Sequence, residues 1–589
     1  MSDMNAAVAA LRRHWGHPDF RKSQKIVVGL ALDDNDVLAV LPTGGGKSAC
    51  FQVPALVRDG GAIVISPLIA LMKDQVDDCH RRNIPATYIN SHVDEDEREE
   101  RIADFIAGAY KLLYIAPERL NTPSFLREIG RATVSYVVVD EAHCCSEWGH
   151  DFRPDYMRIN RLVRALTKRG GVRPPILALT ATATELVTRD IVASLGMRDD
   201  HALVVADPLR PNIRYDVEDA TMSSSLAFQI AHEVIDTMDI GDGRHVLYAN
   251  TRKMAEKLVE MAAERHGEGR AAFYHAGMKK EEREVVQDAF KSGEVPIVCA
   301  TTAFGMGVDV PNIRTVLNFG IPASLEAYVQ QCGRAGRDGK PSVSVVIVDD
   351  YSIRFQRSLI EGANPPWQLY GVVWDYLHGQ LQPDTTLRKT VREMTGEIVS
   401  ITRTAIQETQ VSVILGVLHS KSLIDKRPVE AGTPVTIDVP TFQATLREGT
   451  PKPFVRRVWE ELWTKHVRPE LAKPGMEAER EVTIYLNKHA LQAEAGVSSS
   501  STLNKALEKL VGRGISHLGD TYTGNIIGIR EWRADINTRL PREKIEEKRA
   551  SDVRRFEAML AYTRNREPSQ RAEFLRDYFL KPANVVSAP

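Results

Sequence analysis

Short apolar runs alternate with amphipathic stretches from about residue 20 to about residue 345. The runs are rich in valine and isoleucine, and the stretches between them are long enough for crossover helices. This alternation predicts two α/β domains in tandem, over residues 1–208 and 209–348, each built on a parallel sheet. The runs are Val37 to Leu41, Ala62 to Ser66, Lys111 to Ile115, Val134 to Val139, His245 to Tyr248, Pro296 to Cys299, Thr315 to Asn318 and Ser342 to Val348.

The sequence changes character after residue 350, where helical patterns dominate and strand-like runs are short. Within residues 441–535, a serine-rich turn precedes the helical run Leu503 to Val511, and strand signals follow, ending at Ile526 to Ile529. This order of helix, turn, helix and wing predicts a winged-helix-like domain. Residues 349–440 carry a weaker copy that ends in the strand-like run Pro434 to Val439. The predicted fold is therefore α/β, with a mainly helical C-terminal region that contains winged-helix-like modules.

Length and composition fit several ordinary globular domains. Of the 589 residues, 43% are hydrophobic and 26% are charged, so neither wholesale disorder nor a coiled-coil rod is expected. The formal net charge of -2 does not support a generally basic polymer binder. Any contact with nucleic acid must therefore be a local basic path.

Cysteine usage and hydropathy indicate a protein that works inside the cell. The six cysteines all precede residue 333 and none forms a CxxC pair, which favours a reducing compartment over a disulfide framework. Apolar runs of the length of a membrane span, about 18 residues, are absent from the sequence. We expect a cytoplasmic protein without membrane contact, associated with the nucleoid if the source is bacterial.

A glycine-rich turn joins the first apolar run to a helical pattern, which is the context that a phosphate-binding loop needs. Glycines let backbone N–H groups approach phosphate closely, a lysine neutralises the β- and γ-phosphates, and a serine hydroxyl can ligate Mg²⁺. The first position of the general P-loop pattern is Leu41 instead of glycine, and a glycine-rich turn without this function is the alternative. The turn consists of Pro42, Thr43, Gly44, Gly45, Gly46, Lys47 and Ser48.

Two adjacent carboxylates, Asp140 and Glu141, end the hydrophobic run that begins at Val134. Asp140 can hold Mg²⁺ together with Ser48, and Glu141 can orient and deprotonate an attacking water. A solvent-facing acidic strand end is the alternative, and the nearby P-loop makes it the weaker one. The two motifs together predict phosphoryl transfer from a nucleotide.

The carboxylates open the run Asp140-Glu-Ala-His143, which continues through Cys144 to Tyr156. On these residues the chain resembles RecQ-type ATP-dependent DNA helicases of superfamily 2. The resemblance covers roughly residues 10 to 360, and eight further motifs occur in the family's order. They are Phe20 to Gln24, Ser66 to Gln75, Tyr114 to Glu118, Ala178 to Thr184, Tyr248 to Arg252, Tyr274 to Gly277, Ala300 to Gly307 and Gln330 to Gly339.

The resemblance implies two RecA-like lobes that use ATP and Mg²⁺ to move 3′ to 5′ along single-stranded DNA. It implies that Gln24 reads the adenine edge with Arg21 nearby. It also implies that the second lobe presents Arg334 and Arg337 to the phosphates, where a planar guanidinium stabilises transition-state charge once the lobes close. The catalytic set implied in this way comprises Lys47, Asp140, Glu141, Gln330, Arg334 and Arg337.

Two further groups of motif residues are candidates for coupling DNA binding to hydrolysis. A loop after the carboxylates can sense DNA by stacking, although its aromatic residues taken singly could equally pack the lobe. Hydroxyl, amide and guanidinium donors of the second lobe can contact the phosphodiester backbone, or each could cap a strand end. The two groups are His143, Trp148, Phe152 and Arg153, and Asn250, Thr251, Arg252, Thr301 and Thr302.

The resemblance stops at the zinc module that follows the motor in most RecQ-type proteins, because no cysteine follows Cys332. The histidines after this point are scattered without ligand spacing, so we expect no zinc site. Residues 536–589 faintly resemble the helical hairpin of that module without its ligands. If so, the winged-helix-like segment is inserted before the hairpin.

The helix within the better winged-helix candidate carries Lys505, Lys509 and Arg513 at a spacing of one turn. These three charges would lie on one face and could bind DNA phosphates. The alternatives are a solvated helix surface or a protein docking module, so the C-terminal region could also hold a protein partner.

Three functions compete at this point. The leading hypothesis is a DNA-stimulated ATPase and helicase that acts on single-stranded and forked DNA in repair, recombination or genome defence. An RNA-dependent ATPase is disfavoured by the aromatic-rich loop. A DNA-binding regulator with an inactive motor is disfavoured because the nucleotide-site residues are all intact.

Overall fold

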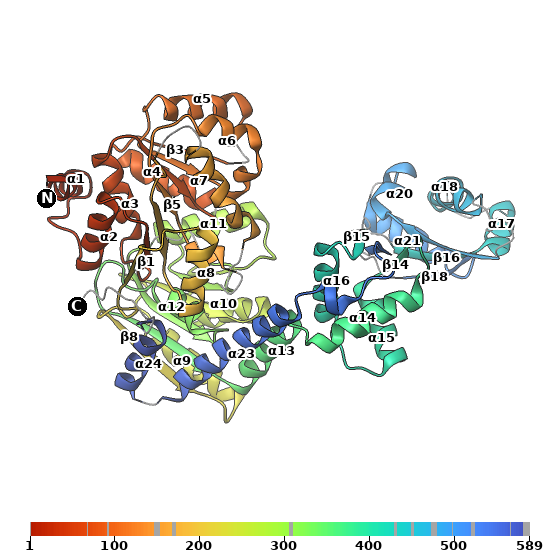
Figure 1. The fold of residues 1–589 in the computed structure, drawn as a ribbon. Coiled ribbons are helices and arrows are strands. Elements are labelled where there is room, and N and C mark those ends of the chain that lie inside the picture. Colours follow the sequence, from red (N-terminus) through yellow and green to blue (C-terminus); the bar gives the residue numbers. More distant parts are fainter. Residues whose placement is uncertain are drawn as a thin grey trace. The chain divides into compact units, whose positions relative to one another are not determined.

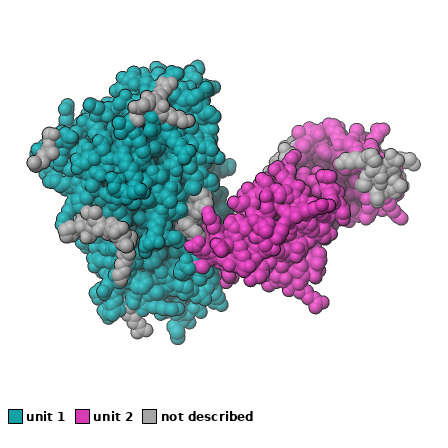
Figure 2. All heavy atoms as spheres, in the orientation of Figure 1, with its two compact units in different colours: residues 1–357, 551–589 teal, residues 358–550 magenta. Residues whose placement is uncertain are grey.

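The computed structural model describes most of the chain. The described residues are 2–67, 69–90, 93–146, 153–167, 172–305, 310–428, 433–448, 453–472, 480–497, 499–519, 525–565 and 567–580. The chain forms two compact units, residues 1–357 with 551–589 and residues 358–550 (Figures 1 and 2). The boundaries fall within α13 (Asp350–Ala363) and α23 (Arg542–Arg564), so the second unit is inserted into the sequence of the first. None of the described helices combines the length and the apolar character needed to cross a membrane.

The first sheet has seven strands in the order β3-β4-β2-β5-β6-β1-β7, and all its pairings are parallel. Successive residues of β1 face opposite sides: Leu38 and Val40 enter one core cluster, and Val37 and Ala39 enter the other. Burial on both faces explains why these strands are continuous apolar runs. The strands are β1 (Val37–Val40), β2 (Gly61–Ile65), β3 (Ala86–Ile89), β4 (Leu112–Ile115), β5 (Val134–Val139), β6 (Ile176–Thr180) and β7 (Ala202–Val205).

Helices connect and cover these strands (Figure 1). The α-helices are α1 (Ser2–Trp15), α2 (Lys22–Leu32), α3 (Lys47–Val57), α4 (Ile69–Arg81), α5 (Glu95–Ile106), α6 (Pro123–Ile129), α7 (Ile159–Thr167) and α8 (Glu185–Leu195). Three short 3₁₀ segments are η1 (Pro117–Asn121), η2 (Ala142–Cys145) and η3 (Pro154–Arg158). Because β1, β6 and β5 are neighbours in a parallel sheet, the loops that follow β1 and β5 meet at the same sheet edge.

The second sheet has six strands in the order β10-β11-β9-β12-β13-β8, and again every pairing is parallel. Two tandem parallel sheets confirm the predicted fold class. The strands are β8 (Ile213–Asp219), β9 (Arg244–Ala249), β10 (Ala271–Tyr274), β11 (Ile297–Ala300), β12 (Ile313–Phe319) and β13 (Ser342–Val348). The helices are α9 (Ser224–Asp236), α10 (Arg252–His266), α11 (Lys280–Ser292) and α12 (Leu325–Cys332).

The chain returns to the first unit through the second half of α23 and through α24 (Pro568–Leu580). These helices pack on the second sheet domain. The hydroxyls of Tyr562 and Tyr328 lie 3.2 Å apart, and Arg571 donates to the carbonyl of Tyr215 at 3.1 Å. Within the described residues, no cluster of three or more His, Cys, Asp or Glu side chains could hold a metal ion. Side-chain contacts therefore attach this hairpin to the motor.

We expect the purified protein to carry no stoichiometric zinc and to keep its fold in a chelator. The reason is that the region after Cys332 has no thiolate to ligate zinc, and the contacts just described fasten the hairpin. Elemental analysis and thermal unfolding with and without EDTA measure this. Close to one zinc per chain, or a lower unfolding temperature in EDTA, would contradict the expectation.

The second unit contains two small sheets with helices packed on them. The first sheet has the order β14-β19-β15. Along the chain its module runs helix, strand, helix, helix, strand, strand, which is the order of a winged helix. Its elements are α14 (Trp367–Gln380), β14 (Leu387–Lys389), α15 (Val391–Thr402), α16 (Glu408–Ser420), β15 (Ile424–Pro428) and β19 (Asn525–Ile529), and the short α22 (Ile536–Arg539) follows.

The second small sheet has the order β17-β16-β18, with β16 in the centre although it comes first in the chain. Its helix α21 begins at the serine-rich turn, where Ser499 Oγ accepts from Thr502 N at 3.2 Å. The elements are β16 (Thr433–Asp438), α17 (Val439–Glu448), α18 (Pro453–Glu461), the π-helical turn η4 (Leu462–Val467), α19 (Arg468–Leu471), β17 (Glu481–Leu486), α20 (Lys488–Glu494), α21 (Ser500–Leu510) and β18 (Ile515–Leu518).

The strand partners differ from those that the sequence order suggests. The order along the chain predicts the run Pro434 to Val439 in the first module and Ile526 to Ile529 in the second. In the structure β16 pairs with β17 and β18, and β19 pairs with β14 and β15. Ile424 pairs with Ile529 in the first small sheet, and Val435 pairs with Leu518 in the second. Apolar periodicity indicates that a segment is a strand, but it does not identify the strand's partner.

Candidate functional site

The loop between β1 and α3 has the backbone of a phosphate cradle. Gly44 and Gly46 adopt positive φ angles of 76° and 77°. A Cβ added at Gly45 would lie 2.7 Å from the carbonyl oxygen of Pro42, and one at Gly46 would lie 2.2 Å from Gln24 Nε2. Only glycine fits at these positions, so the loop stays open toward a ligand. Lys47 then begins α3, and its Nζ is 3.5 Å from the carbonyl of Leu41.

Two residues of the Phe20 to Gln24 motif hold this loop through hydrogen bonds to its backbone carbonyls. The amide of Gln24 donates to the carbonyls of Gly45 and Gly46, each at 3.1 Å, and Arg21 donates to the carbonyl of Gly44 at 2.9 Å. Gln24 Oε1 accepts from the backbone N–H of Arg21 at 2.9 Å. The motif is thus joined to the P-loop, and an adenine contact of Gln24 stays a prediction.

Asp140 and Glu141 lie at the end of β5 and line the same cavity as Lys47 and Ser48. Burial, followed by the charge of Glu141, raises the pKa of Asp140 to about 7, although Lys47 opposes the shift. The buried carboxylate of Asp140 beside the half-buried one of Glu141 is costly without a cation nearby. Together with the Ser48 hydroxyl, these oxygens have the hard-donor chemistry that suits Mg²⁺.

Glu141 has an unusual backbone for a non-glycine residue, with φ 48° in the left-handed region. Its Oε2 is buried without a hydrogen bond inside the described part of the chain, 3.4 Å from His143 Nδ1. His143 Nδ1 also lies 3.0 Å from the hydroxyl of Thr180, which belongs to the motif Ala178 to Thr184. The carboxylate is therefore aimed at the cavity and connected to a neighbouring motif.

Gln75 is a site residue to which sequence reasoning assigned no role. Its Nε2 donates to Ser48 Oγ at 3.2 Å, and its Oε1 accepts from Gln52 at 3.1 Å. Gln52 also donates to the hydroxyl of buried Tyr114 at 2.9 Å. The serine that would hold Mg²⁺ is thereby oriented by a buried polar network. Its position in the Ser66 to Gln75 motif was the available signal.

The second lobe completes the cavity with Gln330, Arg334 and Arg337. The cavity has a volume of about 580 Å³ and is lined by loops of both lobes. The lobes approach closely here, since a Cβ added at Gly333 would lie 2.9 Å from Thr43 Cβ. Arg334 is buried, at 4% exposure, beside the hydroxyl of Tyr248. The structure thus brings together the predicted catalytic set from both lobes.

Arg210 is a second residue that sequence reasoning missed. Its guanidinium donates to the carbonyls of Gly333 at 3.2 Å, Ala335 at 2.8 Å and Gly336. A Cβ added at Gly44 of the P-loop would lie 3.0 Å from Arg210 Nη1. Arg210 therefore lies between the two loops that carry the nucleotide-site residues.

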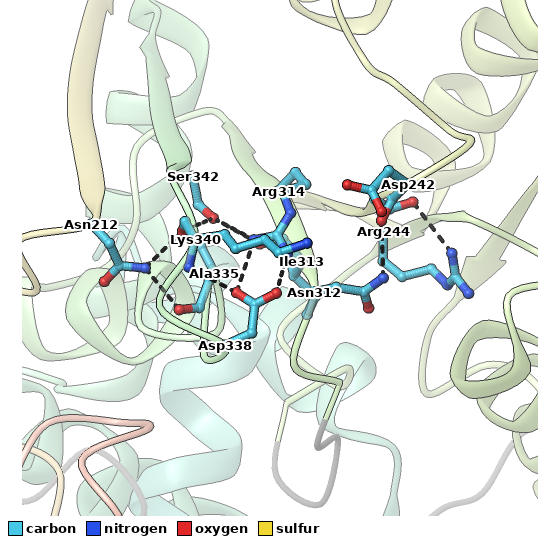
Figure 3. Close-up of polar contacts among 12 residues, drawn as sticks. Asn212, Asp242, Arg244, Asn312, Ile313, Arg314, Ala335, Asp338, Lys340 and Ser342 are labelled. Atoms are coloured by element: carbon cyan, nitrogen blue, oxygen red, sulfur yellow. Dashed lines mark hydrogen bonds and ion pairs between the residues drawn. The ribbon is translucent and has the colours of Figure 1, made fainter.

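The segment after Arg334 is braced further by a polar network (Figure 3). Arg314 pairs with both oxygens of Asp338 and donates to Ser342 Oγ at 3.2 Å, while Asn212 donates to the carbonyl of Lys340 at 2.9 Å. The ion pair with Arg314 lowers the pKa of Asp338. These contacts fix the backbone of the segment that carries Arg334 and Arg337.

Some of the residues predicted to couple DNA binding to hydrolysis make hydrogen bonds within the motor, and others lie outside the described residues. Arg153 donates to the carbonyl of Pro67 at 2.6 Å, while Trp148 and Phe152 lie outside the described residues. Thr251 caps α10 by accepting from Met254 N at 3.2 Å, and Asn250 accepts from Gln356 at 3.1 Å. Thr251 therefore caps the start of a helix and not the strand end that the alternative named. The exposed side chains are Arg252 and Thr302, and Thr301 is half-buried.

The basic face of α21 belongs to the other unit. Lys505, Lys509 and Arg513 are all exposed, whereas Leu503, Leu507 and Leu510 are buried in the module core. Lys509 Nζ lies 5.9 Å from the ring centroid of Phe454. The prediction of three charges on one helix face is wrong for Arg513, because α21 ends at Leu510 and Arg513 lies in the turn after it. All three cations face solvent, and the structure does not identify their ligand.

Two parallel-sheet lobes that share one nucleotide cavity define the class of helicase motors. The family profile of the DEAD/DEAH box helicase matches residues 21–190, and that of the helicase conserved C-terminal domain matches residues 228–339. The chain is 38% identical to the probable ATP-dependent DNA helicase RecS of Bacillus subtilis, over 60% of this chain and 68% of that protein. It is 36% identical to the ATP-dependent DNA helicase RecQ of Synechocystis, over 59% and 72% of the two chains. The chain belongs to the RecQ family of ATP-dependent DNA helicases.

The relatedness is concentrated in the motor. The match to the ATP-dependent DNA helicase RecQ of Haemophilus influenzae is 40% identical over 61% of this chain and spans 56% of that relative. Among solved structures, the DUF1998 helicase MrfA bound to DNA superposes with a TM-score of 0.51 at 19% identity, covering 60% of this chain and 52% of that one. This last likeness concerns the fold alone.

Proposed function

We propose that the protein is a DNA-stimulated ATPase and DNA helicase that moves 3′ to 5′ on single-stranded DNA and separates forked DNA. The observation that carries the proposal is the single cavity lined from one lobe by Lys47, Ser48, Asp140 and Glu141 and from the other by Gln330, Arg334 and Arg337. A motor of this kind would act in DNA repair, recombination or genome defence. Its substrate would place it in the cytoplasm, and at the nucleoid in a bacterium.

Each side chain has a separate task in this proposal. Backbone N–H groups of Gly44 to Ser48 and the Lys47 ammonium bind the phosphates, and Glu141 orients a water and accepts its proton. Mg²⁺, held by Ser48 and Asp140, would neutralise charge on the phosphates. Arg334 and Arg337 add positive charge from the opposite lobe when the lobes are closed. Hydrolysis thus depends on lobe closure, which is how it can drive translocation.

DNA contact is proposed for the remaining motif residues. His143 and Arg153 join the carboxylate motif to Thr180 and Pro67, so a change in the loop between them can reach Glu141. Trp148 and Phe152 would stack on bases. Exposed Arg252 and Thr302, with Asn250, Thr251 and Thr301 beside them, would bind the phosphodiester backbone without reading sequence.

The test of the function is ATP hydrolysis by the full chain with single-stranded DNA, with single-stranded RNA and without polymer, followed by unwinding of forked duplexes with 3′ or 5′ tails. DNA should stimulate hydrolysis more than RNA, and only a 3′ tail should support unwinding. Equal stimulation by RNA would favour an RNA-dependent ATPase. No hydrolysis under any condition would leave a DNA-binding regulator.

The exposed cations of α21 and of the turn after it, which are Lys505, Lys509 and Arg513, are proposed to hold duplex DNA while the motor pulls one strand. Replacing Lys505, Lys509 and Arg513 together with alanine should weaken forked-DNA binding and lower the slope of log K against log salt by up to about three. Unwinding should fall more than ATPase stimulation by single strands. Binding titrations at several salt concentrations measure the slope.

A matched variant controls for loss of charge alone. Lys544, Lys548 and Arg549 of α23 are also exposed in the second unit, and their triple alanine variant removes the same formal charge. It should leave unwinding near the wild-type rate. An unchanged salt slope in the α21 variant would make that face a solvated surface or the docking site of a protein partner.

A further inference from the structure

Helix α12 connects the nucleotide cavity with the C-terminal hairpin. Gln330 lies on this helix and lines the cavity, and Arg334 follows one turn after it. The backbone continues the helix into the arginine segment, since Gly333 N donates to the carbonyl of Val329 at 2.9 Å and Arg334 N to that of Gln331 at 3.2 Å. Any displacement of α12 therefore moves Arg334 with it.

Both hairpin helices converge on one carboxylate of α12. Glu326 is 3% exposed and lies one helical turn before Gln330. Its Oε1 is 3.2 Å from Arg555 Nε of α23 and accepts from the hydroxyl of Tyr578 of α24 at 3.1 Å. The side chain of Arg555 is itself 13% exposed and also approaches Asp552 at 3.5 Å. A buried carboxylate is stable only while such partners remain, so these contacts hold α12 firmly.

A second contact fastens α12 two residues further on. The Tyr328 ring is fully buried, 5.3 Å from the ring of Tyr562 of α23, and their hydroxyls lie 3.2 Å apart. Tyr328 also packs edge-on against Tyr215 of β8, with centroids 6.5 Å apart, and the carbonyl of Tyr215 accepts from Arg571 of the hairpin. The hairpin thus contacts α12 at Glu326 and Tyr328, and the same helix lines the cavity at Gln330.

We propose that the C-terminal hairpin positions the arginines of the ATP site, with Arg555 as the positioning residue. Arg555 acts through Glu326 and α12 and touches no nucleotide. The inference rests on the proposed ATPase function and adds that hydrolysis needs residues far outside the helicase motifs. Helix α23 begins at Arg542 in the second unit and continues into the first, where it carries Arg555. The residue that positions Arg334 and Arg337 therefore lies on a helix that links the two units covalently.

The test compares Arg555→Met, Glu326→Gln and the double variant in the full chain. Arg555→Met removes the ion pair of the buried carboxylate and keeps its hydrogen bond from the Tyr578 hydroxyl, so kcat for ATP should fall at least tenfold while KM for ATP stays within threefold. Glu326→Gln should cost less, because an amide can still accept from Tyr578. In the double variant the ion pair is lost as a unit, so the two losses should not add and kcat should stay within threefold of that of Arg555→Met.

Hydrogen exchange of the segment 325–337 gives a readout that does not depend on activity. Exchange should rise in Arg555→Met and in the double variant, and stay at the wild-type level in P-loop residues 42–48 in both. The matched control is Arg576→Met, which breaks an exposed pair between α24 and Asp207 without touching α12. It should change neither kcat nor exchange.

Wild-type kcat and exchange in Arg555→Met would overturn the positioning role. Losses of Arg555→Met and Glu326→Gln that add in the double variant, or an equal loss in Arg576→Met, would also overturn it. If the wild-type chain showed no DNA-stimulated hydrolysis, the proposed function would fail, and the exchange data would still decide whether the hairpin orders 325–337.

Discussion

Glu141→Gln is expected to bind ATP nearly as the wild type does and to hydrolyse it about 10² to 10⁴ times more slowly. Glutamine has the shape of glutamate but cannot accept a proton at neutral pH. Glu141 lines the cavity, and its backbone is held in a left-handed conformation beside His143, so its carboxylate is positioned to accept a proton from a water in the cavity. The measurement is steady-state ATPase with DNA, beside equilibrium binding of a fluorescent ATP analogue.

Lys47→Ala provides the contrast, because the ammonium binds phosphate in both the ground state and the transition state. That variant should lose affinity for the analogue as well as turnover. Glu185→Gln is a suitable control, since this carboxylate pairs with Arg189 on the surface of the same lobe. Full turnover in Glu141→Gln would refute its assignment as the group that activates water.

The nucleotide site could be predicted because its residues lie in short local motifs. Glycines at fixed positions before Lys47, and two carboxylates at the end of an apolar strand, reveal their chemistry without any knowledge of distant contacts. Gln75 and Arg210 could not be assigned in this way. Gln75 acts through a hydrogen bond to Ser48, 27 residues away, and Arg210 through carbonyls more than 120 residues away. A polar side chain that serves distant backbone looks like any other polar residue in the sequence.

Contacts between distant segments also account for the strand partners in the C-terminal region that differ from the prediction. Runs such as Ile526 to Ile529 identify strands, but pairing joins segments from about 43 to 105 residues apart, so β16 and β19 each belong with the other module. The hairpin contacts with α12 depend on Glu326, Arg555 and Tyr578, which carry no motif of their own. Only the folded chain brings these three side chains together.

Arg334→Ala is expected to lower kcat by about 10³-fold, the lower end of the range for an arginine that stabilises phosphoryl-transfer charge from an opposing domain. Arg334 is almost fully buried at the cavity, and its loop is held by Arg210 and by the helix α12, so its guanidinium is preorganised. Nucleotide affinity should change much less, because Lys47 and the P-loop remain. Arg334→Lys should recover little of the loss, since an ammonium keeps the charge without the planar fork.

Arg337→Ala should also lower kcat, although the side chain of Arg337 is only half-buried. Single-turnover hydrolysis with saturating ATP and DNA separates this effect from slow product release. If Arg334→Ala kept more than a tenth of wild-type kcat, hydrolysis would not depend on that arginine, and lobe closure would have to act on the phosphates through Arg337 or Gln330.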